Sequence, residues 1–472
     1  MLLTRSEAPA ADLSKVERVL IRGRAVIPVS KRGLVISKGV VLIDNGEIAY
    51  VGEQEGSAGR WSKDDLVIDE PYGVVLPGFI DTHVHLAQAL IRGFVPDSVT
   101  LIPWLRDWVW RLQGLYEHED GKASAELCVL EMLRTGTTTF LEAGLHSRYG
   151  IDGVAESVLR SGIRAMLSKK VMDMKGYATV EDALPEGMVE DGEECIEQFL
   201  DARRKWSGAG GGRLDFWIGL RTPGAVSDEM FERVSELADE TGAGVTMHLA
   251  EVKEDLRYFA SRGLTPATFL RRFGLLGRKR VYVHCVWLSE DDMDVFAETG
   301  TSVVHCPSSN AKLGSGVAPV VRMLDKRVNV SLGCDGGPSN DSYDLVREMK
   351  VAALFQKALH GPDRFTAWDA LEMSTVNGAR ALGLEDLIGS LEVGKRGDVV
   401  VIRTKGPSLT PYTDPVSLIV YAATGRDVAH VLVDGQPVVM DGKVLTLDEE
   451  EVLRNAEERF EVVKEKFLRA RT

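Results

Sequence analysis

The sequence predicts an α/β protein: a (β/α)8 TIM-like barrel with a small β-sandwich domain that both chain termini build. Two observations support this fold class. From residue 79 onward, short apolar strands alternate with longer helical patterns about eight times, which favours parallel strands closed into a barrel. Before residue 77 and again near residue 390, short strands instead follow one another with turn signals between them. The alternative, an open doubly wound sheet, lacks a Gly-x-Gly-x-x-Gly run after its first strand.

The first part of the β-sandwich domain is expected over residues 1–77. Apolar runs at 19–21, 39–43 and 48–51 indicate short strands. Asn45-Gly46 lies between alternating apolar residues, which is a strong signal for a β-hairpin.

The barrel is expected over residues 78–385, beginning after the Pro77-Gly78 break. Helical periodicity between its strands is clear at 123–134, 229–239 and 290–297. The eight strand candidates are 79–85, 137–143, 164–171, 215–221, 244–250, 281–287, 301–306 and 329–334.

Residues 386–472 are expected to complete the β-sandwich domain and to end in a helix. Val399–Ile402 and Val428–Val433 indicate strands, and Asp434-Gly435 indicates another hairpin. The tail 448–472 has the pattern of a charged amphipathic helix, which favours a solvated face over a functional element.

Composition and charge exclude several functions. The net charge is −15, from 71 acidic and 56 basic residues, which argues against binding nucleic acid or an anionic membrane by bulk electrostatics. There is no apolar run of about 18 residues and no secretory signal at the N-terminus. The five cysteines form no Cys-x-x-Cys pair, which is typical of reduced thiols. We therefore expect a cytoplasmic enzyme.

Histidines gather at the ends of the predicted barrel strands. His83 and His85 are two residues apart on one strand, so they point to the same side. Five of the nine histidines lie at or near such ends, together with a carboxylate on the last strand. These residues are His83, His85, His248, His284, His305 and Asp335. Because the loops at this face of a barrel build its active site, the pattern predicts a metal centre rather than core histidines.

Three histidines and one aspartate suit Zn²⁺ or Fe²⁺ with one position open for water, whose pKa a divalent metal can lower to about 7. Asp335 could bind the metal and also accept a proton from that water. Glu251, three residues past His248, is placed for a proton shuttle, and His284 could orient the attacking water. For His305, a structural role and a direct catalytic role both stay open.

These motifs together resemble the amidohydrolase superfamily, and within it the aminohydrolase branch of guanine deaminase, S-adenosylhomocysteine deaminase and the s-triazine hydrolases. The resemblance covers nearly the whole chain. The motifs that carry it are Pro77-Gly78, His83-Val-His85, His248-Leu-Ala-Glu251, Val283-His284-Cys285, His305-Cys306-Pro307-Ser308-Ser309-Asn310, Cys334-Asp335-Gly336, and Leu391-Glu392-Val393-Gly394-Lys395 with Asp398.

The resemblance implies one divalent metal, Zn²⁺ ahead of Fe²⁺, held by the four ligands His83, His85, His248 and Asp335. It implies that Glu251 protonates a ring nitrogen and that His284 assists water. Metal-bound hydroxide would then attack the amine-bearing ring carbon, and ammonia would leave. Binuclear relatives use a carbamylated lysine at the end of strand four, whereas this strand ends on Arg221. One metal is therefore expected, with Lys169 and Lys170 on strand three in structural roles. The resemblance also implies a homodimer or larger homo-oligomer.

Four residues are candidate contacts of a heterocyclic substrate. Arg221 carries a planar guanidinium that fits a ring carbonyl or a carboxylate. Gln88 carries an amide that can both donate and accept toward a ring edge. Trp104, on a predicted helix after the first strand, and His305 complete the set, and His146 past strand two could also face the pocket.

These residues bear on three possible functions. The favoured one is hydrolytic deamination of an aminated N-heterocycle, with purine or pterin-like rings ahead of triazines. The second is hydrolysis of another C–N or C–Cl bond at the same site, with chloride, an alkylamine or an acyl amide as leaving group; pocket residues decide between the two. A non-catalytic scaffold is disfavoured, because the chain keeps the full ligand set.

Overall fold

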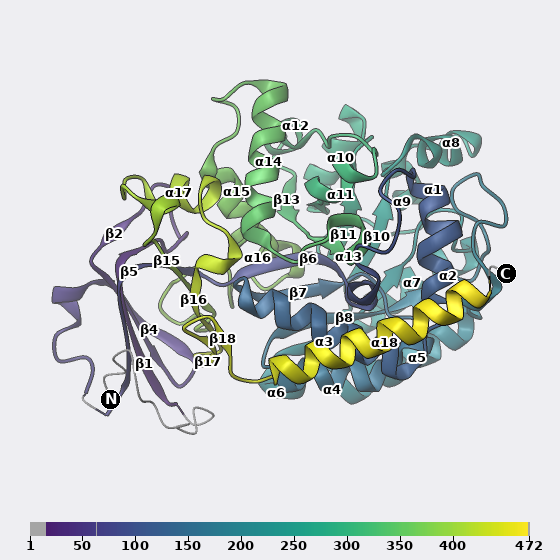
Figure 1. Cartoon of the computed structure of the whole chain (residues 1–472). Coiled ribbons are helices and arrows are strands. Elements are labelled where there is room, and N and C mark those ends of the chain that lie inside the picture. Colours follow the sequence, from purple (N-terminus) through teal and green to yellow (C-terminus); the bar gives the residue numbers. More distant parts are fainter. Residues whose placement is uncertain (1–15, 63, 471–472) are drawn as a thin grey trace.

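The larger part of the chain is a closed barrel of parallel strands with helices around it (Figure 1). This computed structural model describes residues 16–62 and 64–470. The barrel strands are β6 (Phe79–His85), β7 (Thr137–Glu142), β8 (Arg164–Val171), β9 (Leu214–Leu220), β10 (Val245–Leu249), β11 (Arg280–His284), β12 (Ser302–His305), β13 (Asn329–Leu332) and β14 (Asp335–Gly336).

The eighth strand closes the barrel in two parts. β13 pairs with β12 and β14 pairs with β6, and only Gly333 and Cys334 separate the two parts. Across this seam the Thr82 hydroxyl donates to the carbonyl oxygen of Leu332 at 2.8 Å. The predicted fold class and its eight strand positions are therefore confirmed, although the last strand is interrupted where the sequence predicts one run to residue 334.

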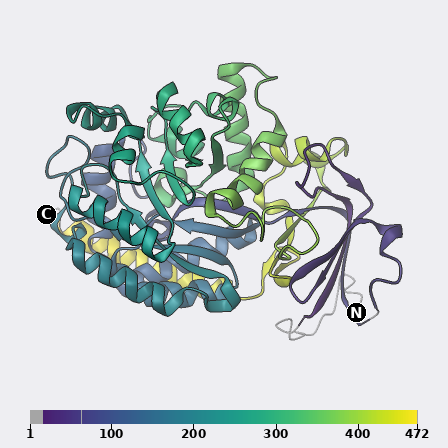
Figure 2. The same ribbon diagram turned by 180° about the vertical axis from the view of Figure 1, so that it is seen from behind.

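Helices follow the barrel strands and cover their outer side (Figures 1 and 2). Several begin at a side-chain cap: the hydroxyl of Ser227 accepts from the backbone N–H of Met230, and that of Ser289 from Asp292. The longer helices are α3 (His118–Arg134), α4 (Ile151–Ser161), α5 (Gly192–Trp206), α7 (Asp228–Thr241), α8 (Lys253–Ser261), α10 (Glu290–Thr299) and α14 (Leu345–His360). Shorter ones are η3 (Leu86–Ile91), α1 (Leu101–Trp104), η4 (Leu105–Val109), α2 (Trp110–Gln113), α9 (Pro266–Arg272), α11 (Pro307–Lys312), α12 (Val320–Asp325), α13 (Gly337–Asn340), α15 (Ala367–Met373), α16 (Val376–Leu382) and α17 (Pro415–Tyr421).

Both ends of the chain build a second, mixed sheet beside the barrel, as the sequence predicts (Figure 1). The two ends meet where β5 and β15 pair antiparallel, with Leu76 opposite Val400. The Asn45-Gly46 hairpin is confirmed: both residues have positive φ, 49° and 81°, as a tight two-residue turn requires. The strands are β1 (Arg18–Val26), β2 (Ile36–Ser37), β3 (Gly39–Asp44), β4 (Glu47–Glu53), β5 (Leu66–Pro77), β15 (Val399–Arg403), β16 (Val428–Val433), β17 (Gln436–Met440) and β18 (Lys443–Val444).

A buried ion cluster joins the sheet to the barrel. Arg164 at the start of β8 donates to the carboxylates of Asp398 and Asp434. At the crossing from β5 to β6, a Cβ on Gly78 would lie 2.1 Å from Thr138 Oγ1, so only glycine fits there. The chain changes from one sheet to the other here, and the domain limits 1–77, 78–385 and 386–472 stay predictions.

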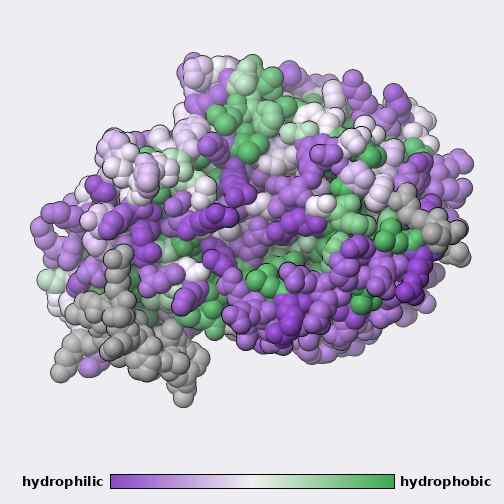
Figure 3. All heavy atoms as spheres, viewed as in Figure 1, coloured by the Kyte–Doolittle hydropathy of each residue, from purple (hydrophilic) through white to green (hydrophobic). Residues whose placement is uncertain are grey.

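The C-terminal helix α18 (Glu449–Arg469) lies along the outside of the barrel beside α3 (Figure 1, yellow). Val463 and Phe467 are buried, the Phe467 ring packs against Phe94 and Trp108, and Arg459 donates to Asp120 of α3 at 2.6 Å. The surface around α18 is mainly hydrophilic (Figure 3). Within the described part of the chain, no helix combines the length and apolar character that a membrane crossing needs.

Candidate active site

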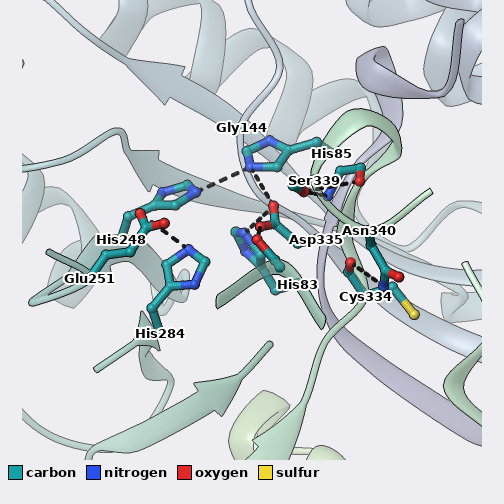
Figure 4. Close-up of polar contacts among 12 residues, drawn as sticks. His83, His85, Gly144, His248, Glu251, His284, Cys334, Asp335, Ser339 and Asn340 are labelled. Carbon is teal, nitrogen blue, oxygen red and sulfur yellow. Dashed lines mark hydrogen bonds and ion pairs between the residues drawn. The ribbon is translucent and has the colours of Figure 1, made fainter. Parts of the chain in front are cut away.

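Four side chains converge at the C-terminal ends of the barrel strands. His83 and His85 come from β6, His248 from β10 and Asp335 from β14, and one ligand atom from each lies within 4.8 Å of the others. The Nε2 atoms of His85 and His248 are 3.1 Å apart. Asp335 Oδ1 lies 3.4 Å from Nε2 of His83 and 3.3 Å from Nε2 of His85 (Figure 4).

The backbone explains how these residues meet. Alternation along β6 turns His83 and His85 to one side, and β14 pairs in parallel with β6 so that Asp335 lies opposite Val84. Asp335 has φ of 67°, a left-handed conformation that is costly for a residue with a Cβ. Such strain persists only where surrounding contacts hold it and is concentrated at functional sites.

The protonation states of the group fit a bound cation. The Nδ1–H of His248 donates to the carbonyl oxygen of Arg221 at 3.0 Å, which leaves the lone pair on Nε2. Burial lowers the pKa of His83, His85 and His248, so the imidazoles are neutral. Burial alone would raise the pKa of Asp335, but the neighbouring imidazole of His83, with Nε2 3.4 Å from Oδ1, lowers it. The Ser309 hydroxyl donates to Oδ2 at 2.5 Å.

Both ring nitrogens of His83 are buried without a hydrogen-bond partner among the described residues. An orphaned imidazole beside two others and an ionised carboxylate is expected where a metal supplies the missing partner. Three imidazole nitrogens and one carboxylate oxygen are ligands that suit a divalent cation such as zinc. The group therefore supports a divalent metal.

A second trio of possible ligands, Glu70, His430 and Asp441, lies in the small sheet. The guanidinium of Arg403 already pairs with two of these residues, at 2.9 Å from Glu70 and 2.8 Å from Asp441. The positive charge of this guanidinium disfavours binding of a metal ion by the same carboxylates.

Glu251 and His284 lie together beside the four-ligand group. Glu251 Oε2 is 3.5 Å from His284 Nε2, and the rings of His284 and His83 have centroids 5.8 Å apart. The Nδ1–H of His284 donates to Oδ1 of Asn310 at 2.8 Å, so Nε2 carries the lone pair. Burial, with the nearby charge of Asp335, raises the pKa of Glu251 to about 8, so its carboxyl holds a proton at neutral pH.

Arg221 and Gln88 are both buried next to the ligand group. The backbone of Arg221 binds His248, and its guanidinium carbon lies 5.6 Å from the centre of the Trp110 ring. Gln88 follows the first two ligands on η3, and its Oε1 is so close to Gly336 that a Cβ there would lie 1.8 Å away. Arg221 Nη1 and Gln88 Oε1 have no hydrogen-bond partner within the described chain, so both are available to a substrate.

The other candidates are less closely tied to the ligand group. Trp104 and His305 are buried, and neither the Trp104 indole nitrogen nor the two His305 ring nitrogens have a hydrogen-bond partner among the described residues. Burial and then the charge of His284 lower the pKa of His305 to about 3. His146 instead accepts from the backbone N–H of Arg148 and lies 3.5 Å from Glu190.

Comparison with known sequences decides the family. Residues 74–438 match the amidohydrolase family over most of the chain. The chain belongs to the amidohydrolase family. It is therefore a hydrolase that acts on carbon–nitrogen bonds, as the sequence motifs indicate.

This amidohydrolase is similar to 5-methylthioadenosine/S-adenosylhomocysteine deaminase of Moorella thermoacetica. The two are 37% identical over 421 residues, which are 89% of this chain and 93% of the relative. It is also similar to the crystal structure of a Xanthomonas campestris adenosine deaminase with bound zinc, at 28% identity, with a TM-score of 0.88 and coverage of 94% and 98% of the two chains. The E. coli guanine deaminase structure matches at 26% identity, with a TM-score of 0.79 and coverage of 89% and 99%.

Three polar residues of the amidohydrolase site had no role assigned from the sequence: Ser309, Asn310 and Ser315. The first two lie on α11 and bind Asp335 and His284, and the hydroxyl of Ser315 donates to Glu251 at 3.3 Å. The signal was the Pro-Ser-Ser-Asn run directly after a strand that ends on a histidine. A proline at the first helical position starts the helix at the face where the site lies.

Proposed function

We propose that this amidohydrolase is a metal-dependent hydrolytic deaminase of an aminated N-heterocycle, with purine or pterin-like rings favoured. The observation that carries the proposal is the juxtaposition of the four-ligand group with Glu251 and His284. One set of residues can hold a divalent cation, and the other can hold and move a proton. The names of the relatives, which are deaminases of adenine-type nucleosides and of guanine, support the same reaction class.

His83, His85, His248 and Asp335 hold the metal, with Zn²⁺ expected ahead of Fe²⁺. When bound, a divalent cation supplies a water of lowered pKa, about 7 in zinc enzymes. Asp335 is an ionised carboxylate at this position, so it accepts the proton that the attacking water gives up. His284 orients this water through Nε2, because Asn310 holds the hydrogen on Nδ1.

Glu251 starts with a proton, because burial raises the pKa of its carboxyl to about 8. It donates this proton to a ring nitrogen next to the amine-bearing carbon, which makes that carbon more electrophilic. A C–O bond then forms and the C–N bond breaks, and the proton first taken from water leaves with the amine as ammonia. The hydroxyl proton that remains on the new C–O group returns to Glu251 as the ring C=O forms. The general acid and base are thus both provided by the chain.

Arg221 and Gln88 contact the ring of the substrate. Their free, buried polar atoms beside the ligand group match the hydrogen-bonding edge of a heterocycle. Trp104 and His305 stay predicted substrate contacts, and a homodimer or larger assembly stays a prediction as well.

An ammonia-release screen over purines, pterins, pyrimidines and triazines tests the proposal. The metal-loaded enzyme should release ammonia from at least one ring, and Asp335→Asn should release none. Chloride and alkylamine release are measured on the same panel. Release of those groups without ammonia would contradict deamination and favour hydrolysis of another C–N or C–Cl bond, and a panel without any product would contradict the proposed substrate class.

A further inference from the structure

Lys170 near the end of β8 carries a buried amine that the chain leaves unpaired. The side chain is 3% exposed, and the structure gives its ammonium no hydrogen bond or ion pair to any residue of 16–62 or 64–470. Its ring contact is with Tyr149, 5.5 Å from the ring centre. The neighbouring Lys169 differs, because its ammonium lies 2.9 Å from the carboxylate of Glu190. Only one of the two lysines is therefore in the structural role that the sequence predicts for both.

Arg221 is a second buried cation on the adjacent strand β9. It is 4% exposed, and Nη1 has no hydrogen-bond partner among the described residues. Its guanidinium faces the ring of Trp110, so each of the two cations has an aromatic neighbour instead of a carboxylate. Aromatic faces attract cations only weakly compared with a paired anion.

Lys170 and Arg221 leave two neighbouring strands on the same side of the sheet as His248. Lys170 lies opposite Gly219, which lies opposite Thr246, and Arg221 and His248 each follow two residues further along their own strands. Burial, followed by the charge of Arg221, lowers the pKa of Lys170 to about 7.

The carboxylates nearby are engaged elsewhere. Glu142 accepts from the backbone N–H groups of Leu86 at 2.8 Å and Gly144 at 3.2 Å, and burial raises its pKa to about 7. Glu190 accepts from Lys169. Glu142 and Glu190 therefore form no ion pair with Lys170 or Arg221, and a bound anion could pair with these two cations.

We propose that Lys170 and Arg221 form an anion-recognition subsite that selects aminated heterocycles bearing an anionic oxygen, either a carboxylate or an acidic ring oxo group. This inference rests on the proposed function, because it names the class of ring that the deaminase takes. A neutral adenine-type ring leaves both cations unpaired, whereas an anionic oxygen accepts from both. Substrate selection thus differs from that suggested by the names of the nucleoside-deaminating relatives.

Binding of unreactive matched pairs to the metal-loaded enzyme tests the subsite. Orotate and uracil differ by one carboxylate, and urate, an anion at neutral pH, carries two more ring oxo groups than neutral hypoxanthine; none of the four carries an exocyclic amine. Calorimetry should give orotate or urate a Kd about 10- to 100-fold below that of its neutral partner, as charge-assisted hydrogen bonds require. If the Kd ratio is larger for orotate and uracil, the subsite prefers a carboxylate; if it is larger for urate and hypoxanthine, the subsite prefers an acidic ring oxo group.

Lys170→Met and Arg221→Met should each reduce that ratio at least about tenfold, whereas Lys443→Met, which removes an exposed lysine of the small sheet, should not change it. Melting temperatures without ligand identify any variant that fails to fold. Equal Kd values within both pairs, no binding by either anion, or a preference that persists in Lys170→Met would overturn the subsite. An intact preference with a silent ammonia screen would instead refute the deaminase proposal alone.

Discussion

Glu251→Gln separates proton transfer from simple hydrogen bonding at the site. Glu251 is 2% exposed, accepts from Ser315 at 3.3 Å and lies 3.5 Å from His284 Nε2. Glutamine keeps the volume and can keep the Ser315 contact, but it has no proton to give. Loss of one hydrogen bond costs about 1 kcal/mol, or about fivefold in rate, whereas loss of a general acid costs about 100- to 10,000-fold, or about 2.7–5.4 kcal/mol.

The assay is steady-state ammonia release on the best ring of the screen, together with metal content and melting temperature. We expect kcat to fall at least about 100-fold while the metal stays bound. Glu254→Gln is the matched control: the same change three residues further along, at a half-buried carboxylate paired with Arg257. A loss of kcat below about tenfold in Glu251→Gln would refute its role as general acid. An inactive variant that has lost its metal would also refute this reasoning, because metal loss would then explain the inactivity.

Three further outcomes are expected. Metal analysis should find about one zinc or iron per chain, and a chelator should stop ammonia release until metal is added back; two metals per chain would contradict the mononuclear site. Asn310→Ala should lower kcat/KM about 10- to 100-fold with the metal retained, because His284 loses its orienting partner; unchanged kinetics would show that the contact is dispensable. Burial acts to raise the pKa of Glu70, but the hydrogen bonds and charges of His430 and Arg403 outweigh it, so this pKa is lowered from 4.5 to about 2. The stabilisation by its carboxylate is therefore complete above pH 4.5 and lost toward pH 2, so the unfolding free energy should fall less steeply over this range in Glu70→Gln; equal slopes would contradict it.

The barrel was predictable because its strands are buried on both faces and its helices have one apolar face. Such strands appear as short apolar runs, and the eight positions follow from them. The break in the last strand, between Leu332 and Asp335, was not predictable, and neither was the left-handed φ of 67° at Asp335. Apolar periodicity reports which face a residue occupies, and it carries no signal for a single dihedral of an aspartate.

The convergence of the four candidate ligands was predictable for a related reason. His83, His85, His248 and Asp335 each stand at a strand end, and barrel topology brings all strand ends of one polarity to one face. Lys170 also lies near a strand end, but the sequence predicts a structural role for it. The sequence cannot show which of two adjacent lysines pairs with a carboxylate. Only the fold reveals that, of the two lysines, Lys169 is the one paired with Glu190.

Two strained residues and one short helix explain why the site is held in place. His284 and Asp335 have φ of 71° and 67°, which costs about 1–3 kcal/mol each in residues with a Cβ. Asn310 accepts from His284 and Ser309 donates to Asp335, and these two partners are consecutive residues of α11. Because Pro307 fixes the first turn of that helix, its two hydrogen bonds reach both strained strand ends at once. Asp335, the proposed proton acceptor, and His284, which we propose orients water, are thus positioned by one element, so a shift of α11 would disturb both together.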